Sequence, residues 1–255
     1  MKFVFEKIKI RVRRYLSISR RVHLGLALRH RSKGYELLRG NGLEIGALHN
    51  PAKISKDCQV EYADAMSAAE ASTLFPELNS NEFVPVSIIV DLDLAGLSNI
   101  KDESYDFVVL NHVIEHVANP IFTIKELFRV VRPGGHIVVS APDKNFTYDK
   151  PRKLTSFEHL YAEFLAHTTQ VSDDHYYDLA LAALNVKELE DSELLFKKMA
   201  WYRLRREHAH VWDSQSFKEF MRACQTLLGF KAQIQFESVG KDNRLENFSV
   251  WQKLM

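Results

Sequence analysis

The sequence is poor in the features that mark secreted and membrane-spanning proteins. Only two of its 255 residues are cysteines, Cys58 and Cys224, and they lie too far apart to suggest a disulfide framework. The amino end contains no long hydrophobic run, because Lys or Arg interrupts the apolar residues every few positions. This interruption excludes the apolar core of a signal peptide and a membrane span. We therefore expect a cytoplasmic protein with buried thiols.

Positive charge is concentrated in one part of the chain. Residues 1–40 carry 12 Lys and Arg against two Glu, whereas the rest of the chain carries 22 basic and 31 acidic side chains. The apolar residues of this arm recur at helical spacing: Phe5, Ile8, Val12, Tyr15 and Leu16. We expect a basic amphipathic helix, which either caps the domain or contacts an anionic membrane surface. No alternation of aromatic and basic residues supports RNA binding, so no nucleic-acid partner is expected.

From residue 42 onward, apolar runs with strand character alternate with helical stretches. The strand candidates are 42–46, 58–64, 84–91, 105–111 and 135–142. Helical periodicity lies between them at 65–74 and, more clearly, at 120–131. Strands that alternate with helices predict βαβ units and a parallel sheet covered on both faces. The expected fold class is therefore α/β, doubly wound.

This alternation stops after the fifth strand candidate. Residues 143–213 are rich in His, Tyr, Lys and acidic side chains, with helical segments near 156–166 and 177–205. The region is too long for a plain loop and predicts an inserted helical lid that contributes to substrate binding. We therefore expect a basic arm over 1–40 and one domain over 41–255 that contains the lid.

The end of the chain predicts one more helix and a closing pair of strands. Ser214 is the predicted N-cap of the helix, and Gly229 is its predicted end. Residues 230–239 and 247–253 then predict two antiparallel strands.

Polar residues follow the ends of the predicted strands. In an open parallel sheet, ligands bind beyond the carboxyl ends of the strands. The residues at these ends are Glu44 and Gly46, then Asp64, then Asp91 and Asp93, then Asn111 and His112. A carboxylate about 20 residues after the first turn can accept hydrogen bonds from two ribose hydroxyls, and Asp64 meets that spacing from Glu44. Three acidic strand ends in succession favour a ribose-containing ligand.

Five segments stand in a characteristic order over residues 42–143: LEIGALHNP, VEYADAM, VDLDLAGL, SYDFVVLNHVIEHVANP and RVVRPGGHIVVSAPD. In this order and spacing they resemble the class I S-adenosylmethionine-dependent methyltransferases, and the first loop resembles a variant within the type 11-like group. The resemblance implies a Rossmann-like, mostly parallel seven-stranded sheet with an antiparallel last strand, and S-adenosylmethionine as the cofactor. It implies cofactor contacts from Glu44, Gly46, Ala47 and Asn50 at the methionine part, Asp64 at the ribose, Asp93 and Leu94 at the adenine, and Asn111 and His112 beneath the sulfonium.

The first loop departs from the family pattern. Family members usually carry three glycines here, and Leu48 and Asn50 occupy the later two positions. The cofactor has no pyrophosphate, so the loop needs less close backbone approach, and Asn tolerates a left-handed conformation. We therefore expect a working loop, and we expect no NAD, whose pyrophosphate needs the second glycine. The alternative is a relic that keeps the fold without binding the cofactor.

A competing motif follows the fourth strand candidate. Residues 112–116, HVIEH, match the inverzincin pattern, in which two His one helical turn apart hold zinc. A subset of the superfamily places a Glu and a His here on a divalent ion, which would make Glu115 and His116 magnesium ligands. No third ligand is evident in the sequence. We expect no metal, and we assign both residues to orienting the loop over the cofactor.

Transfer of a methyl group to a hydroxyl needs a base, and an imidazole titrates in the right range. The candidate bases are His116, His159 and His210, with His208 beside them in the sequence. A polar cluster follows the fifth strand candidate and consists of Arg152, Thr155 and His159. These side chains suit a methyl acceptor that carries hydroxyl, carboxylate or phosphate groups.

The polar lid and the variant loop together favour O-methylation of a sugar or glycan, because that loop is often associated with surface-polysaccharide synthesis. If the glycan is carried on a lipid, the basic arm would hold the enzyme near the membrane. The alternatives are a methyltransferase acting on N or C of a small molecule, and a non-catalytic partner of a glycosyltransferase.

Overall fold

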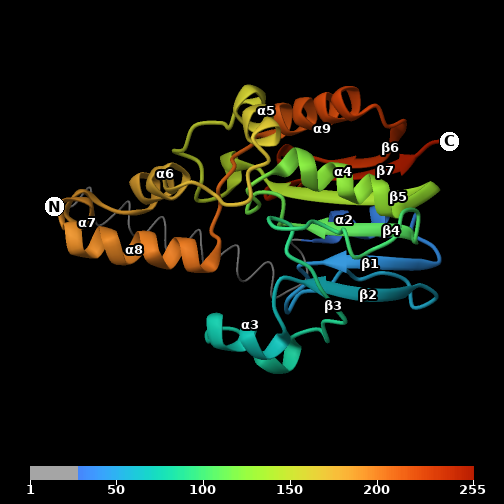
Figure 1. The fold of residues 1–255 in the computed structure, drawn as a ribbon, viewed down its shortest axis with the longest axis horizontal. Helices are drawn as coiled ribbons and strands as arrows, with labels where there is room; N and C mark the ends of the chain where they lie inside the picture. Colours follow the sequence, from blue (N-terminus) through green and yellow to red (C-terminus); the bar gives the residue numbers. More distant parts are fainter. Residues whose placement is uncertain (1–27) are drawn as a thin grey trace.

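The computed structural model describes residues 28–255, in which a central sheet is flanked by helices (Figure 1). The strand order is β3-β2-β1-β4-β5-β7-β6. The strands are β1 (Asn41–Ile45), β2 (Gln59–Asp64), β3 (Ile88–Ile89), β4 (Tyr105–Asn111), β5 (Val131–Pro142), β6 (Ala232–Ser238) and β7 (Glu246–Lys253). β7 is antiparallel to both of its neighbours, and the other pairs are parallel. The expected Rossmann-like sheet with a reversed last strand is confirmed.

Nine α-helices are present in the described part of the chain: α2 (Arg29–Tyr35), α3 (Ala68–Leu74), α4 (Pro120–Val130), α5 (Phe157–Leu165), α6 (Asp173–Ala183), α7 (Val186–Glu190), α8 (Ser192–Arg205), α9 (Ser214–Leu228) and α10 (Gly240–Asn243). Alternate residues of the central strands pack into two cores. Val108 and Leu110 of β4 pack on the side of α4 and α9, whereas Phe107 and Val109 pack on the side of Tyr35 in α2. Both faces of the sheet are thereby covered.

Helix α4 illustrates how local sequence sets an element. The Asn119 side chain caps it by accepting a hydrogen bond from Phe122 N, and Pro120 stands in its first turn, where a missing N–H costs nothing. The helix passes directly into β5. Gly135 is required at this junction, because a Cβ there would lie 2.5 Å from the Asp106 carbonyl oxygen. The predicted helix over 120–131 is confirmed to within one residue.

Three boundary predictions were wrong, each for a physical reason. The strand expected over 84–91 is reduced to Ile88–Ile89, because β3 pairs with one neighbour only and Pro85 lacks an N–H to donate. The helix expected over 177–205 is divided into three, because Asn185 and Asp191 cap α7 and α8 with their side chains. Helix α9 is capped by Asp213, not by Ser214.

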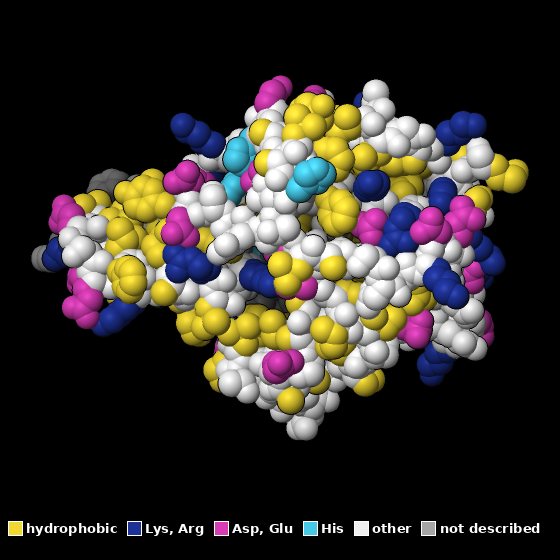
Figure 2. Space-filling model, in the orientation of Figure 1, with side chains coloured by type: hydrophobic (Ala, Val, Ile, Leu, Met, Phe, Trp, Pro, Cys, Tyr) yellow, Lys and Arg dark blue, Asp and Glu magenta, His cyan; other side chains and the backbone are white. Residues whose placement is uncertain are grey.

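Helices α5 to α8 form the inserted region, and α6, α7 and α8 extend away from the sheet (Figure 1). Hydrophobic side chains lie on the surface of this extension (Figure 2). Leu181 of α6 and Phe196 and Leu204 of α8 are exposed. Of the expected basic arm, residues 1–27 lie outside the described residues, and α2 packs against the sheet. The division into arm, domain and lid remains a prediction. Among residues 28–255, no helix has the length and apolar character needed to cross a membrane.

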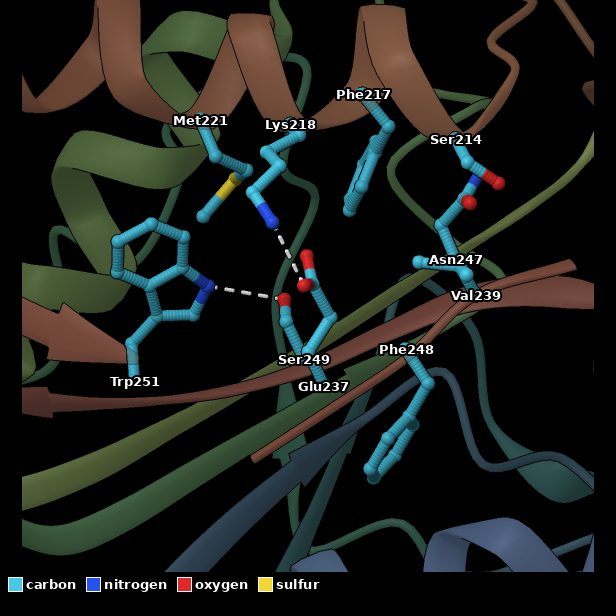
Figure 3. Close-up of a pocket in the computed structure, with 10 residues that line it drawn as sticks. All are labelled: Ser214, Phe217, Lys218, Met221, Glu237, Val239, Asn247, Phe248, Ser249 and Trp251. Carbon is cyan, nitrogen blue, oxygen red and sulfur yellow. Dashed lines mark hydrogen bonds and ion pairs between the residues drawn. The ribbon is translucent and has the colours of Figure 1, made fainter. Parts of the chain in front are cut away.

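Helix α9 packs on the end of the sheet formed by β6 and β7. Phe217 and Met221 point from the helix toward the sheet, with Met221 above Trp251 (Figure 3). Trp251 Nε1 donates a hydrogen bond to Ser249 Oγ at 2.9 Å. Phe248 points to the opposite face, as the alternation of a strand requires. The crevice between these residues has a volume of about 10 Å³, which is at most the space of one water molecule.

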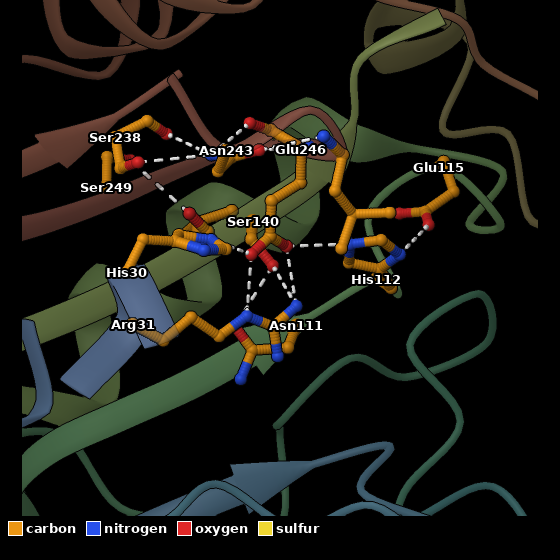
Figure 4. Close-up of polar contacts among 12 residues, drawn as sticks. His30, Arg31, Asn111, His112, Glu115, Ser140, Ser238, Asn243, Glu246 and Ser249 are labelled. Atoms are coloured by element: carbon orange, nitrogen blue, oxygen red, sulfur yellow. Dashed lines mark hydrogen bonds and ion pairs between the residues drawn. The ribbon is translucent and has the colours of Figure 1, made fainter. Parts of the chain in front are cut away.

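A buried ion pair joins α2 to the start of β7. The Glu246 carboxylate accepts hydrogen bonds from Arg31 Nε at 2.7 Å and Arg31 Nη2 at 2.5 Å (Figure 4). His30 and His112 contact the same carboxylate at 2.5 Å and 2.7 Å. Burial alone would raise the pKa of Glu246, but Arg31 and these hydrogen bonds hold it well below its ordinary range. An ionised Glu246 therefore ties α2 and the loop after β4 to the sheet.

We expect Arg31→Met to lower the free energy of unfolding by about 3–5 kcal/mol, because it leaves the Glu246 carboxylate buried without its cation. Urea denaturation of the variant measures this loss. The matched control is Arg132→Met, which breaks an exposed pair with Asp106 and should cost less than about 1 kcal/mol. Equal losses for the two variants would contradict the role given to the buried pair.

Candidate active site

The carboxyl ends of four parallel strands meet around a cavity of about 330 Å³. Its walls come from the loops after β1, β2, β3 and β4, and from the end of α8 in the lid. The lining residues are Ile45, Gly46, Leu48, Asp64, Ala65, Met66, Phe75, Val90, Leu92, Asp93, Val113, His116, Val117, Arg205, Arg206 and Glu207. A mostly apolar cavity with a few converging polar groups is the usual form of a cofactor site.

The buried Glu44 side chain holds the loop after β1 in place. Both oxygens of the buried Glu44 carboxylate accept hydrogen bonds from Ala52 N, at 2.8 Å and 3.1 Å. Burial raises the pKa of Glu44 to about 7. Gly46 adopts a φ of 71°, and a Cβ there would lie 2.5 Å from Val113 Cγ2. The single glycine that this loop retains therefore stands where the backbone and the opposite wall leave no room for a side chain.

Leu48 and Asn50 occupy the two positions where the family usually has glycine. Leu48 adopts the left-handed conformation, with a φ of 49°, whereas the sequence suggested Asn50. Leucine in this conformation costs about 1–2 kcal/mol. Asn50 is exposed and lines a separate cavity of about 270 Å³ between α2 and the loop. Its proposed contact with the cofactor remains a prediction.

Acidic side chains from β2 and β3 enter the cavity. Asp64 accepts a long hydrogen bond of 3.4 Å from Met66 N, and Asp93 accepts one of 2.6 Å from Ala118 N. Burial raises the pKa of both carboxyls. Arg206, the C-cap of α8, closes this side by pairing with Asp91 at 2.6 Å and facing Asp93 at 3.5 Å. The lid thus supplies the cation that balances the strand-end acids.

The other residues expected at the cofactor lie outside the lining of the cavity. These are Glu44, Ala47, Asn50, Leu94, Asn111 and His112. The Leu94 side chain is 68% exposed. The Asn111 amide donates to Tyr35 Oη at 2.9 Å, and His112, with a φ of 54°, is held by Glu246. Their assignment to the cofactor stays a prediction.

Histidines surround the buried Glu115 beneath the cavity. His116 lines the cavity, and its Nδ1 donates to Arg206 O at 2.5 Å, which leaves Nε2 without a proton. Glu115 Oε1 lies 3.7 Å from His116 Nε2 and 3.8 Å from His208 Nε2. His112 Nδ1 also lies 3.8 Å from Glu115 Oε1. Within residues 28–255, neither carboxylate oxygen of Glu115 has a hydrogen-bond partner.

The two neighbouring imidazoles of this cluster differ in protonation. Burial, and then the charge of His208, lower the pKa of His116 to about 3. Burial would also lower the pKa of His208, but the Asp149 carboxylate, 2.7 Å from its Nδ1, raises it. The ring centroids lie 4.8 Å apart, so a proton on one ring opposes a proton on the other. His208 therefore carries the charge, and His116 is neutral.

The structure places HVIEH in turns after β4, not on a helix, so the geometry that an inverzincin needs is absent. The sequence missed two members of the site, Asp149 and Arg206. His208 was one candidate base among several, whereas the contribution of Asp149 and Arg206 carried no local pattern at all. They come from opposite ends of the lid region.

Residues 38–225, most of the chain, match a family of methyltransferase domains. The chain belongs to this family. It is therefore an S-adenosylmethionine-dependent methyltransferase, and S-adenosylmethionine is its cofactor.

Individual relatives are distant. The methyltransferase is 25% identical over 165 residues to an uncharacterized protein from Methanocaldococcus jannaschii. This match covers 63% of this chain and 71% of that protein. A solved methyltransferase from Thermotoga maritima is 18% identical, with a TM-score of 0.46 and coverage of 99% and 100% of the two chains. The CurJ carbon methyltransferase is 14% identical, with a TM-score of 0.43; the match covers 85% of this chain and 49% of that one, so this chain spans about half its length.

The lid residues expected at the acceptor lie away from the cavity. Arg152 is buried and bound to Asp149 at 2.9 Å and Asp178 at 2.7 Å. Thr155 Oγ1 accepts from Val211 N at 3.0 Å. The other two candidate bases, His159 and His210, form a separate cluster with His175. The roles given to these four residues in acceptor binding and catalysis remain predictions.

We expect Gly46→Ala to weaken S-adenosylmethionine binding at least about tenfold, because the new Cβ meets Val113 and strains the loop by about 1–2 kcal/mol. Isothermal titration calorimetry measures the affinity. Gly134→Ala is the matched control, since Gly134 has a φ of 83° but no atom within 4 Å of an added Cβ. Equal affinities for the two variants would show that the loop does not contact the cofactor.

Proposed function

We propose that this methyltransferase transfers a methyl group to a hydroxyl of a sugar or glycan. The observation that carries the proposal is the His116 imidazole at the wall of the cofactor cavity, whose Nδ1 donates to Arg206 O, so that its Nε2 carries no proton. A hydroxyl must lose its proton as its oxygen attacks, so it needs a base in reach. A neutral amine attacks with its lone pair and needs no such group at that step.

The cavity suits the cofactor. The Asp64 carboxylate lines the cavity and makes a long hydrogen bond of 3.4 Å with Met66 N, so it would be placed to accept hydrogen bonds from the two ribose hydroxyls. Val90 and Leu92 offer an apolar surface to the adenine, with Asp93 at its edge. When bound, S-adenosylmethionine supplies an electrophilic methyl group on its sulfonium. The protein supplies alignment and a route for the proton.

That route leads from the cavity into the buried cluster. His116 Nε2 takes the hydroxyl proton as the O–H bond breaks and the bond from oxygen to the methyl group forms, and Glu115 Oε1, 3.7 Å from the same nitrogen, faces the imidazolium that results. Burial raises the pKa of Glu115, so its carboxylate accepts a proton more readily than an exposed one. Burial, and then the charge of His208 beside Asp149, lower the pKa of His116 and so keep it free of a proton between turnovers.

The direct test supplies labelled S-adenosylmethionine with three acceptor panels: mono- and oligosaccharides, phenols, and primary amines. We expect label on the saccharides, and a loss of about 10²–10⁴ in kcat for His116→Asn, as is usual for a lost base. His167→Asn, an exposed lid histidine, should leave the rate unchanged. Label confined to phenols or amines would overturn the sugar assignment. No heat with S-adenosylmethionine would indicate a non-catalytic relic.

The pH profile tests the histidine pair. The base must be neutral, and the pKa of His116 is about 3, so kcat/KM should not fall through protonation of His116 between pH 7 and pH 5. His208→Asn removes the neighbouring charge and should raise the pKa of His116, so the acid limb moves toward neutral pH. An unmoved limb in this variant would contradict the coupling.

We also propose that the basic amino-terminal segment contacts an anionic membrane, which would place the enzyme near a lipid-carried glycan. The support is charge alone: residues 1–27 carry eight Lys and Arg against one Glu. Sedimentation with phosphatidylserine vesicles should retain the full chain better than a variant lacking residues 1–27. Neutral phosphatidylcholine vesicles are the control, and equal retention of both proteins on anionic vesicles would refute the contact.

A further inference from the structure

Three histidines and a glutamate converge in the lid, away from the cofactor cavity. His159 and Glu163 lie one turn apart on α5, His175 lies in the first turn of α6, and His210 lies between α8 and α9. We call these four residues the lid cluster. One ring nitrogen of each histidine lies within 4.8 Å of those of the other two. The proposed proton route uses none of these residues.

The spacing of the ligand atoms is that of a metal site. His159 Nε2 lies 3.1 Å from His175 Nε2. Glu163 Oε1 lies 3.1 Å from His159 Nε2 and 3.3 Å from His175 Nε2. A tetrahedral zinc ion with bonds of about 2.0–2.1 Å needs neighbouring ligand atoms about 3.3–3.4 Å apart. Three atoms of the cluster therefore stand within about 0.3 Å of the separation that a tetrahedral zinc ion requires.

The fourth ligand lies slightly farther out. The His210 ring centroid is 4.9 Å from that of His175 and 6.3 Å from that of His159. The His159 side chain is 48% exposed, so it can rotate toward the others without disturbing the core. Rotation of this exposed ring brings it nearer to His210, and the separation of 4.9 Å between the His175 and His210 rings is the other one that zinc binding would have to shorten.

Backbone carbonyls fix which nitrogens carry lone pairs. His175 Nδ1 donates to Ala209 O at 3.0 Å, and His210 Nε2 donates to Val117 O at 3.0 Å. A carbonyl oxygen only accepts, so His175 Nε2 and His210 Nδ1 are left without protons. Histidines that bind metals show this arrangement, in which one nitrogen donates to the protein and the other holds the ion.

Two buried atoms of the lid cluster lack partners. His210 Nδ1 and Glu163 Oε2 are both buried, and neither has a hydrogen-bond partner anywhere in residues 28–255. A buried acceptor without a partner is costly, and native proteins leave few of them. A cation between the rings would satisfy the bare lone pair of His210 Nδ1. His175 Nε2 already lies within hydrogen-bond distance of His159 Nε2 and Glu163 Oε1, and Glu163 Oε2 lies 3.7 Å from His210 Nε2.

We propose that the lid cluster binds one zinc ion, with three imidazole nitrogens and one carboxylate oxygen as ligands. Zinc suits this donor set and four-coordinate geometry. Four protein ligands leave no open position, so the ion is structural: it cross-links α5, α6 and the segment before α9. His159 and His210 then act as ligands and not as catalytic bases, and the metal is one that the sequence did not lead us to expect.

The test is zinc binding by the full-length chain after removal of metals with a chelator. Calorimetry with zinc chloride and elemental analysis should give one ion per chain. His159→Asn and His175→Asn should each weaken the affinity at least about tenfold, whereas His167→Asn, an exposed histidine on the same lid, should bind as the unaltered chain does. Circular dichroism tests whether each variant is folded. If His175→Asn is unfolded, the zinc affinity of His159→Asn, a change at an exposed position, decides the question.

The buried Glu115 cluster is the competing site, because Glu115, His116 and His208 also place their ligand atoms within 4.8 Å of one another. His116→Asn should therefore leave zinc binding intact. The proposal is overturned if the unaltered chain binds no zinc, or if binding survives both His159→Asn and His175→Asn but is lost in His116→Asn. Bound cobalt(II) gives a second readout, since a tetrahedral site absorbs visible light far more strongly than an octahedral one.

Discussion

The parallel pairing of β1 with β2 and β4 is the constraint on which the site depends. Ile45 pairs with Ala63 on one side and with Leu110 on the other, so three strands end at the same edge of the sheet. Because parallel strands share a direction, the residues that follow them must meet there. Gly46, Asp64 and the loop that carries His116 are therefore brought around one cavity by the pairing of the strands.

The carboxylates of Asp91 and Asp93 concentrate negative charge at this partly buried edge, and arginines from the lid balance that charge. Arg206 pairs with Asp91 and faces Asp93, while Arg205 pairs with Glu77 at 2.6 Å and lies over the Phe75 ring. These contacts come from the end of α8, so the position of the lid and the ionisation of the strand-end acids depend on each other. A cofactor that binds between them meets a wall assembled from both parts.

The segment from His208 to His210 connects the two histidine clusters. Ala209 N and His210 N donate to Glu115 O at 2.8 Å and 3.0 Å, which fixes the segment against the loop after β4. His208 then contacts Glu115 and Asp149, while His210 joins His159 and His175. One short segment therefore contributes a histidine to each cluster. An ion in the lid would thereby steady the imidazole that governs the proton on His116.

The sequence by itself determined the alternation of strands and helices, and with it Gly46, Asp64 and Asp93 as residues at one edge, because hydrophobic periodicity and strand ends are local properties. The tertiary structure alone decided the pairs that set the chemistry: His208 with Asp149, Arg206 with Asp91, and Arg31 with Glu246 are 59, 115 and 215 positions apart. It also decided that Leu48, not Asn50, takes the left-handed position. No local pattern encodes such contacts, since they form only when the lid and the first helix pack against the sheet.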